Sequence, residues 1–126
     1  MIAIGIGCRG GAARDAIVSL VLGACRSAGV EPTAASLFSL DRKAGEAGLL
    51  AAADLLGLPL RFLAAPEMAA ADPLVVTRSA RSTEATGIAS VAEAAALAGA
   101  GKGARLLLPR IAADGVTCAI AYGENE

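Results

Sequence analysis

Residues 1–11 read Met-Ile-Ala-Ile-Gly-Ile-Gly-Cys-Arg-Gly-Gly, an apolar run followed at once by glycines. The β-branched residues at 2–6 predict a short, buried central strand. Residues 12–28 carry apolar side chains at helical spacing, and Gly29 predicts the end of that helix. A strand, a tight turn and a helix in succession are typical of an α/β fold, so this stretch indicates the class of the whole domain.

The glycine turn at residues 7–11 is the first candidate binding site. The first N–H groups of a helix have no partner within it, and the helix dipole makes that end partly positive. We therefore expect a phosphate or carboxylate to bind the turn, with the Arg9 guanidinium adding a full charge. The candidate ligand-binding residues are Gly7, Cys8, Arg9, Gly10 and Gly11.

Other interpretations of the turn remain open. Gly5, Gly7 and Gly10 match the GxGxxG spacing of dinucleotide-binding folds, but no acidic residue lies at the expected distance of about 20 positions. The glycines could also serve packing alone. Cys8 could become a nucleophile beside Arg9 and a helix N-terminus. A small side chain that fits a tight turn is the favoured interpretation of Cys8.

The composition fits a single domain over residues 1–126. Its 11 basic and 12 acidic residues give a net charge of −1, so nucleic acid is not an expected partner. The chain has no histidine, which removes the commonest general base and metal ligand and excludes a Ser-His-Asp or Cys-His mechanism within one chain. We expect neither a metal site nor a cofactor.

The location is predicted from the cysteines and from the apolar runs. The 3 cysteines lack CxxC or zinc-type spacing, which favours a reduced, cytoplasmic protein. No apolar run approaches the ~18 residues that a membrane span requires. No basic segment precedes the first apolar run, as it would in a signal peptide. We therefore expect no membrane association.

The rest of the chain alternates between predicted strands and helices. Further strands are expected at 35–40, 60–64, 104–108 and 116–122, and further helices at 46–56, after Pro66, after Ser79 and from Ser90 to about residue 98. Ser90 and Glu93 match a capping box, in which Glu93 reaches back to the start of its own helix. The Asp114-Gly115 connection predicts an antiparallel hairpin. This order predicts a three-layer α/β/α domain with a mixed, mostly parallel sheet of about five strands that ends in the hairpin.

A charged cluster follows the second predicted strand. It contains Asp41, Lys43 and Glu46. Loops at the carboxyl ends of strands line the ligand crevice of open α/β sheets, so this cluster is expected near the glycine turn. Asp41 or Glu46 is a candidate general base, and Lys43 is its candidate electrostatic partner. A solvated loop in which Asp41 caps the next helix is an equal alternative.

A second polar cluster precedes the capping box. It contains Arg78, Ser79, Arg81, Ser82 and Thr83. The two arginines could close over a polyanionic ligand, because each guanidinium offers a planar fork of donors. The favoured alternative is a mobile surface segment. Arg78, Ser79 and Arg81 are the candidate ligand-binding residues of this cluster.

Five segments in order resemble a known family, the one formed by CobE and the C-terminal domain of CbiG proteins of cobalamin biosynthesis. They span nearly the whole chain. The segments are Gly-Ile-Gly-Cys-Arg at 5–9, Asp-Arg-Lys at 41–43 with Glu-Ala-Gly-Leu at 46–49, Leu-Pro-Leu-Arg-Phe at 58–62, Gly-Ile-Ala-Ser-Val-Ala-Glu-Ala-Ala-Ala at 87–96, and Val-Thr-Cys-Ala-Ile-Ala at 116–121.

The resemblance implies a role near ring contraction and lactone opening in corrin synthesis. It implies a tetrapyrrole ligand, a precorrin or corrinoid, whose acetate and propionate arms suit the donors predicted above. Other enzymes of the pathway are implied partners. A binding or accessory protein is the favoured hypothesis, and a hydrolase or isomerase on the same macrocycle or a nucleotide-binding module is the alternative.

Overall fold

The computed structural model describes residues 1–124, without the side chains of Arg81 and Ala85. In that part of the chain the strands are β1 (Ile2–Cys8), β2 (Ala35–Leu40), β3 (Leu60–Leu63), β4 (Arg105–Ala113) and β5 (Val116–Tyr122). The helices are α1 (Arg14–Ala28), α2 (Ala47–Leu56), α3 (Ala65–Ala69), α4 (Ala80–Thr86) and α5 (Val91–Ala100). Short 3₁₀ turns at Pro32–Ala34, Asp41–Lys43 and Asp72–Leu74 lie between them.

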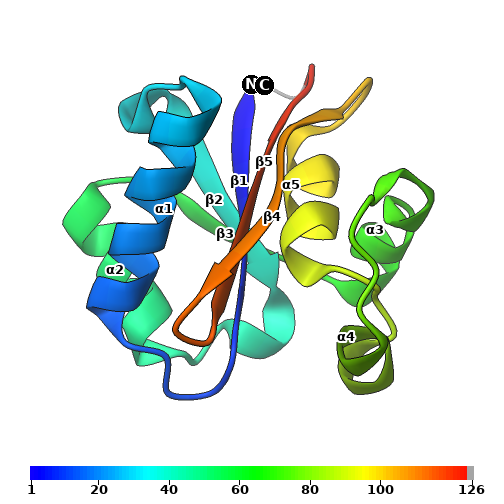
Figure 1. The fold of residues 1–126 in the computed structure, drawn as a ribbon, viewed down its shortest axis with the longest axis horizontal. Coiled ribbons are helices and arrows are strands. Elements are labelled where there is room, and N and C mark those ends of the chain that lie inside the picture. The colour runs from blue at the N-terminus through cyan, green and yellow to red at the C-terminus, as the bar shows by residue number, and fades with distance from the viewer. Residues whose placement is uncertain (125–126) are drawn as a thin grey trace.

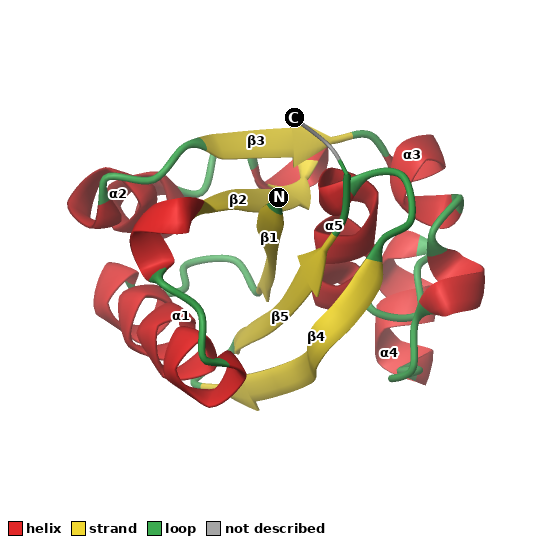
Figure 2. Ribbon diagram, turned by 90° about the horizontal axis from the view of Figure 1, so that it is seen from above, coloured by secondary structure: helices red, strands yellow, loops and turns green. Residues whose placement is uncertain are grey.

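The strands form one mixed sheet in the order β3-β2-β1-β5-β4. β1 pairs in parallel with β2, and β2 with β3, whereas β5 runs antiparallel to both β1 and β4. Helices α1 and α2 cover one face, while α5, with α3 and α4 beyond it, covers the other (Figures 1 and 2). The predicted three-layer α/β/α domain with a five-stranded mixed sheet and a terminal hairpin is confirmed.

The first glycines belong to β1 and not to the turn. β1 continues to Cys8, and the following helix begins at Arg14. A Cβ on Gly5 would overlap the carbonyl oxygen of Ala92 and lie 2.5 Å from the backbone nitrogen of Ala96. The missing side chain therefore allows α5 to lie directly on the central strand. Gly5 serves helix packing, which the sequence left as an alternative to the dinucleotide-binding interpretation.

Helix α5 is almost wholly inside the protein. Its buried residues are Ala92, Glu93, Ala94, Ala95, Ala96, Leu97, Gly99 and Ala100. Alanine gives a helix with high intrinsic propensity and a thin cross-section, so it fits between the sheet and α3. The core on this face is built largely from small side chains, whereas Ile4, Ile17, Leu37 and Leu49 fill the core on the face of α1 and α2.

Strand β4 is longer than the sequence predicted. It continues through Pro109 to Ala113. Its register against β5 shifts between Leu108 and Ile111, which lets the strand pass the proline and stay paired. A bulge inserts an extra residue, and an edge strand tolerates a proline that cannot donate to the ladder. The bulge also redirects the residues within it, Pro109 and Arg110.

The contact between β1 and α5 gives a stability prediction. We expect Gly5→Ala to destabilise the fold by about 3 kcal/mol or more, because the obstructing atoms are backbone and α5 must move away from the sheet. Gly45→Ala is the matched control, since a Cβ at Gly45 meets no atom within 4 Å. Urea unfolding followed by circular dichroism measures both. Equal midpoints for the two variants would contradict the prediction.

Candidate functional site

The amides of Arg9, Gly11 and Ala12 in the glycine turn are occupied, which counts against the predicted anion cradle. The N–H of Arg9 donates to the carbonyl of Gly115 at 3.0 Å, and the N–H of Ala12 donates to the carbonyl of Arg9 at 3.2 Å. The N–H of Gly11 donates to Oε2 of Glu46 at 3.1 Å. The chain therefore satisfies these donors itself, as polar backbone groups in folded proteins usually are. Gly10 and Gly11 lie in the turn and are not among the residues that line the neighbouring cavity.

A cavity of about 260 Å³ lies beside this turn, on the α5 side of β1. We call it the arginine pocket, and it is lined by Gly7, Cys8, Arg9, Ser79, Ser82, Ser90, Val91, Arg110, Gly115 and Thr117. The end of β1, the start of β5, the N-terminal ends of α4 and α5, and the bulge of β4 all contribute to its walls. Of the predicted site residues, it brings together Gly7, Cys8, Arg9 and Ser79.

Two guanidinium groups line the pocket, from Arg9 and Arg110. Among the described residues, the ion pairs join Arg14 to Asp15 and Arg78 to Asp72, and neither involves a pocket arginine. The side chain of Arg9 lies over Gly115, where a Cβ would meet its carbon and nitrogen atoms. The pocket therefore presents two positive charges without a matching carboxylate on its walls, as expected for a site that receives an anion.

Four hydroxyl groups lie on the same walls, from Ser79, Ser82, Ser90 and Thr117. Ser82 donates to the carbonyl of Ile88 at 2.6 Å, and Thr117 donates to the carbonyl of Gly7 at 3.3 Å. Ser79 and Ser90 instead act as helix caps, accepting from the N–H of Ser82 at 3.2 Å and of Glu93 at 3.3 Å. A hydroxyl that accepts a bond keeps its proton for donation. The caps of α4 and α5 can therefore each donate to a ligand in the pocket.

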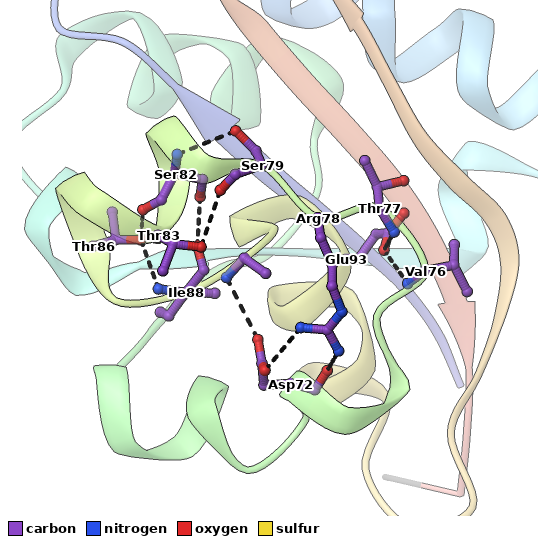
Figure 3. Close-up of polar contacts among 11 residues, drawn as sticks. Asp72, Val76, Thr77, Arg78, Ser79, Ser82, Thr83, Thr86, Ile88 and Glu93 are labelled. Carbon is purple, nitrogen blue, oxygen red and sulfur yellow. Dashed lines mark hydrogen bonds and ion pairs between the residues drawn. The ribbon is translucent and has the colours of Figure 1, made fainter.

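Glu93 does not close the predicted capping box. Its side chain is fully buried, and Figure 3 shows it beside Val76 and Thr77. Oε1 accepts from the N–H of Val76 at 2.8 Å and of Thr77 at 2.9 Å, and Oε2 accepts from the N–H of Arg110 at 2.9 Å. Only the Ser90 half of the predicted motif is present.

The charge of Glu93 is stabilised by these donors. Burial alone would raise the pKa of this carboxyl, but the N–H groups of Arg110, Thr77 and Val76 outweigh it and hold the pKa below its ordinary value. A carboxylate that accepts several backbone N–H bonds stays ionised even inside a protein. Glu93 is therefore a buried anion that is bonded to two separate segments of the chain.

The candidate catalytic cluster lies next to the pocket but does not line it. Asp41 and Lys43 are in the 3₁₀ turn after β2, and Glu46 precedes α2 and binds the N–H of Gly11. Lys43 and Glu46 both act electrostatically on Cys8, so the expected nearness of the two loops is confirmed. Asp41 does not cap α2, whose first residue is preceded by Glu46 without a side-chain cap.

The second polar cluster is divided by the structure. Ser79 lines the pocket, whereas Arg78 turns away and pairs with Asp72 through its Oδ2 at 3.2 Å and its carbonyl at 3.0 Å (Figure 3). Arg78 is therefore engaged within its own segment and does not reach a ligand in the pocket. The side chain of Arg81 lies outside the described part of the chain.

Cys8 is a half-buried thiol, whereas Cys25 and Cys118 are buried in the core. Desolvation raises the pKa of Cys8, the positive charge of Lys43 lowers it, and the negative charge of Glu46 raises it, with a net increase. Burial raises the pKa of Cys118 to about 12. The structure therefore supports the interpretation of Cys8 as a small, mostly protonated side chain at neutral pH.

Within residues 1–124, no group of three or more Cys, Asp or Glu side chains is arranged to hold a metal ion. Among the helices described, none is long and apolar enough to cross a bilayer.

The fold and the pocket define a three-layer α/β domain whose sheet edge carries a small cavity lined by arginines and hydroxyls. The family model described as Cobalamin synthesis G C-terminus matches residues 2–121. The chain belongs to this family of cobalamin biosynthesis proteins, as the sequence resemblance predicted.

Similar proteins agree with this assignment. Protein CobE of Sinorhizobium sp is 34% identical over 119 residues, covering 94% of this chain and 77% of that protein. A crystal structure of CobE, described as a protein from the cobalamin (vitamin B12) biosynthetic pathway, superposes with a TM-score of 0.91 at 35% identity, covering 100% of this chain and 92% of that one. Cobalamin biosynthesis protein chiG from Agrobacterium tumefaciens str. C58 has a TM-score of 0.75 at 39% identity, with 99% and 100% covered.

The position of Cys8 between two opposite charges gives a kinetic prediction. We expect Glu46→Gln to lower the pKa of Cys8 and to speed its alkylation by iodoacetamide near neutral pH, because a repulsive charge is removed. Lys43→Gln is expected to do the opposite. The pH dependence of the alkylation rate measures both pKa values. Shifts in the same direction would contradict the prediction.

The buried charge of Glu93 gives a stability prediction. We expect Glu93→Gln to cost about 1–3 kcal/mol at neutral pH, because an amide offers a single acceptor oxygen and turns N–H groups toward a backbone N–H. Folding lowers the pKa of Glu93, so its contribution is complete above the ordinary value of 4.5 and is lost as the pH falls through the folded value.

Urea unfolding of both proteins from about pH 7 to about pH 3 measures this contribution. The gap between wild type and Glu93→Gln is expected to narrow at acid pH. Glu67→Gln, at an exposed carboxylate that binds the N–H of Ala64, is the control. A gap that is independent of pH would contradict the prediction.

Proposed function

We propose that this domain binds a carboxylate-rich tetrapyrrole, a precorrin or corrinoid intermediate, through the arginine pocket. The observation that carries this proposal is the pair of guanidinium groups, Arg9 and Arg110, which line one cavity without an acidic partner there. Guanidinium groups bind carboxylates in a two-pronged geometry, and the hydroxyls of Ser79 and Ser90 supply further donors. Membership of a cobalamin biosynthesis family supports a tetrapyrrole as the carrier of those carboxylates.

The size of the pocket determines how such a ligand would bind. Cavities that enclose a drug-sized ligand hold roughly 300–1,000 Å³, and the arginine pocket holds about 260 Å³. A macrocycle does not fit inside, but its acetate and propionate arms do. We propose that the arms enter the pocket while the ring lies across its mouth.

A binding role is better supported than catalysis. The candidate bases Asp41 and Glu46 do not line the pocket, and Glu46 is engaged with the N–H of Gly11. A nucleotide-binding role has less support, because Gly5 and Gly7 lie within β1 and the amides of Arg9, Gly11 and Ala12 are occupied. We propose an accessory protein that holds an intermediate near ring contraction and lactone opening and works beside the pathway's enzymes in the cytoplasm.

Binding of a model octacarboxylate tests the proposal. Uroporphyrin carries acetate and propionate arms, and its octamethyl ester presents the same ring without charge. We expect wild type to bind uroporphyrin and not the ester in fluorescence titrations. Arg9→Ala and Arg110→Ala are each expected to weaken binding about tenfold or more, since a charge-assisted hydrogen bond contributes about 1.5–3 kcal/mol.

Arg61→Ala is the matched control, because Arg61 is exposed on β3 at the opposite edge of the sheet. Its affinity is expected to equal that of wild type. The proposal would be overturned if Arg9→Ala, Arg110→Ala and Arg61→Ala bound uroporphyrin with the same affinity. Equal binding of uroporphyrin and its ester by wild type would also overturn it. The titrations measure binding alone, so they do not depend on any turnover of uroporphyrin.

A further inference from the structure

The carboxylate of Glu93 accepts hydrogen bonds from two separate segments of the chain. One segment is the stretch between the 3₁₀ turn Asp72–Leu74 and α4, which donates the N–H groups of Val76 and Thr77 at 2.8 and 2.9 Å. The other is the bulge of β4, which donates the N–H of Arg110 at 2.9 Å. Glu93 is thus the shared acceptor between α5 and both segments.

Each of these segments carries a wall of the arginine pocket. The Arg110 side chain lines the pocket from the same residue whose N–H is held. Thr77 lies two positions before Ser79, which also lines the pocket and caps α4. The carboxylate itself is fully buried and is not among the lining residues. Glu93 therefore does not touch a ligand in the pocket, but it fixes residues that do.

The chemistry requires a charged acceptor at this place. Two carboxylate oxygens accept the three N–H groups, and no donor of Glu93 opposes them. A bulge places its residue outside the ladder of β5, so the N–H of Arg110 needs another acceptor to hold its orientation. Without that acceptor the backbone of the bulge can change conformation. The Arg110 guanidinium is then no longer held in place at the cavity.

We propose that Glu93 is a positioning residue for the ligand site, which acts through Arg110 by holding the bulge of β4. This inference rests on the proposed function, because the arginine pocket is the ligand site only under that proposal. The placement of Arg110 itself can be measured without any tetrapyrrole. Cys8 provides the reporter, since it lines the same pocket and the other cysteines are buried.

The measurement compares two alkylating reagents at Cys8. Iodoacetate is an anion and iodoacetamide is neutral, so the ratio of their rates reports the positive potential around the thiol and is independent of the thiolate fraction. We expect Arg110→Ala to lower this ratio about threefold or more, because a pocket charge that attracts the anion is lost. Cys8→Ser, which should abolish labelling by both reagents, assigns the signal to Cys8.

A double-variant cycle then tests the role of Glu93. Glu93→Gln is expected to lower the ratio as much as Arg110→Ala does, and the double variant is expected to lower it no further. Arg9→Ala is expected to keep its own effect in the Glu93→Gln background, because Glu93 does not bond the Arg9 backbone. Independent effects of Glu93→Gln and Arg110→Ala, or an unchanged ratio in Glu93→Gln, would overturn the proposal.

A loss of stability alone must not produce the same result. Leu49→Ala is the control, because Leu49 is buried on the opposite face of the sheet and its truncation destabilises the fold away from the pocket. Its ratio is expected to equal that of wild type, and an equal fall in both variants would overturn a specific positioning role. If Glu93→Gln does not fold, Glu93→Asp, which keeps the charge on a shorter arm, replaces it. If neither folds, Glu93 serves the fold as a whole and the proposal is overturned.

The two proposals fail in different ways. If wild type does not bind uroporphyrin but the cycle shows the expected coupling, the positioning role stands and the tetrapyrrole function fails. If uroporphyrin binds and the cycle shows independent effects, the function stands and the positioning role fails. In the case where both hold, Glu93→Gln and Arg110→Ala weaken uroporphyrin binding by the same factor.

Discussion

The close contact between α5 and β1 is the constraint on which the rest of the structure depends. It exists because Gly5 has no side chain where the backbone of α5 passes over the strand. An alanine-rich helix can then lie flat on the sheet and be buried along its length. The N-terminal end of α5 consequently lies at the carboxyl end of β1, and the pocket forms where these two ends meet the hairpin.

The same burial places a carboxylate in the interior, where its charge must be balanced by hydrogen bonds. Glu93 accepts from three N–H donors, and these belong to two segments that each contribute a residue to the lining of the pocket. The buried anion therefore serves the architecture, while the positive charges of Arg9 and Arg110 stay open to the cavity. This separation of charges lets a domain with a net charge of −1 present a cationic site.

Much of the fold could be predicted from local patterns, and the site only in part. Apolar periodicity and turn residues predicted the strands, the helices and their layers, and of the predicted ligand-binding residues the structure brings Gly7, Cys8, Arg9 and Ser79 to one cavity. Arg110, Ser90 and Thr117 were missed as pocket residues, and Ser82 was recognised only as a member of the second polar cluster. For Arg110 the available signal was Pro109, directly after the predicted strand at 104–108, because a proline there indicates an edge strand or bulge, where a chain can redirect its next side chain.

The sequence by itself determined the α/β class, the absence of histidine chemistry and the family, because these depend on composition, spacing and ordered segments within one chain. Only the tertiary structure decided which polar groups are engaged in hydrogen bonds or ion pairs within the protein and which are available to a ligand. The amides of the glycine turn pair with Gly115 and Glu46, Arg78 pairs with Asp72, and Glu93 leaves its expected cap for distant donors. Such pairings join residues far apart in the chain, and local patterns carry no information about partners that only folding brings together.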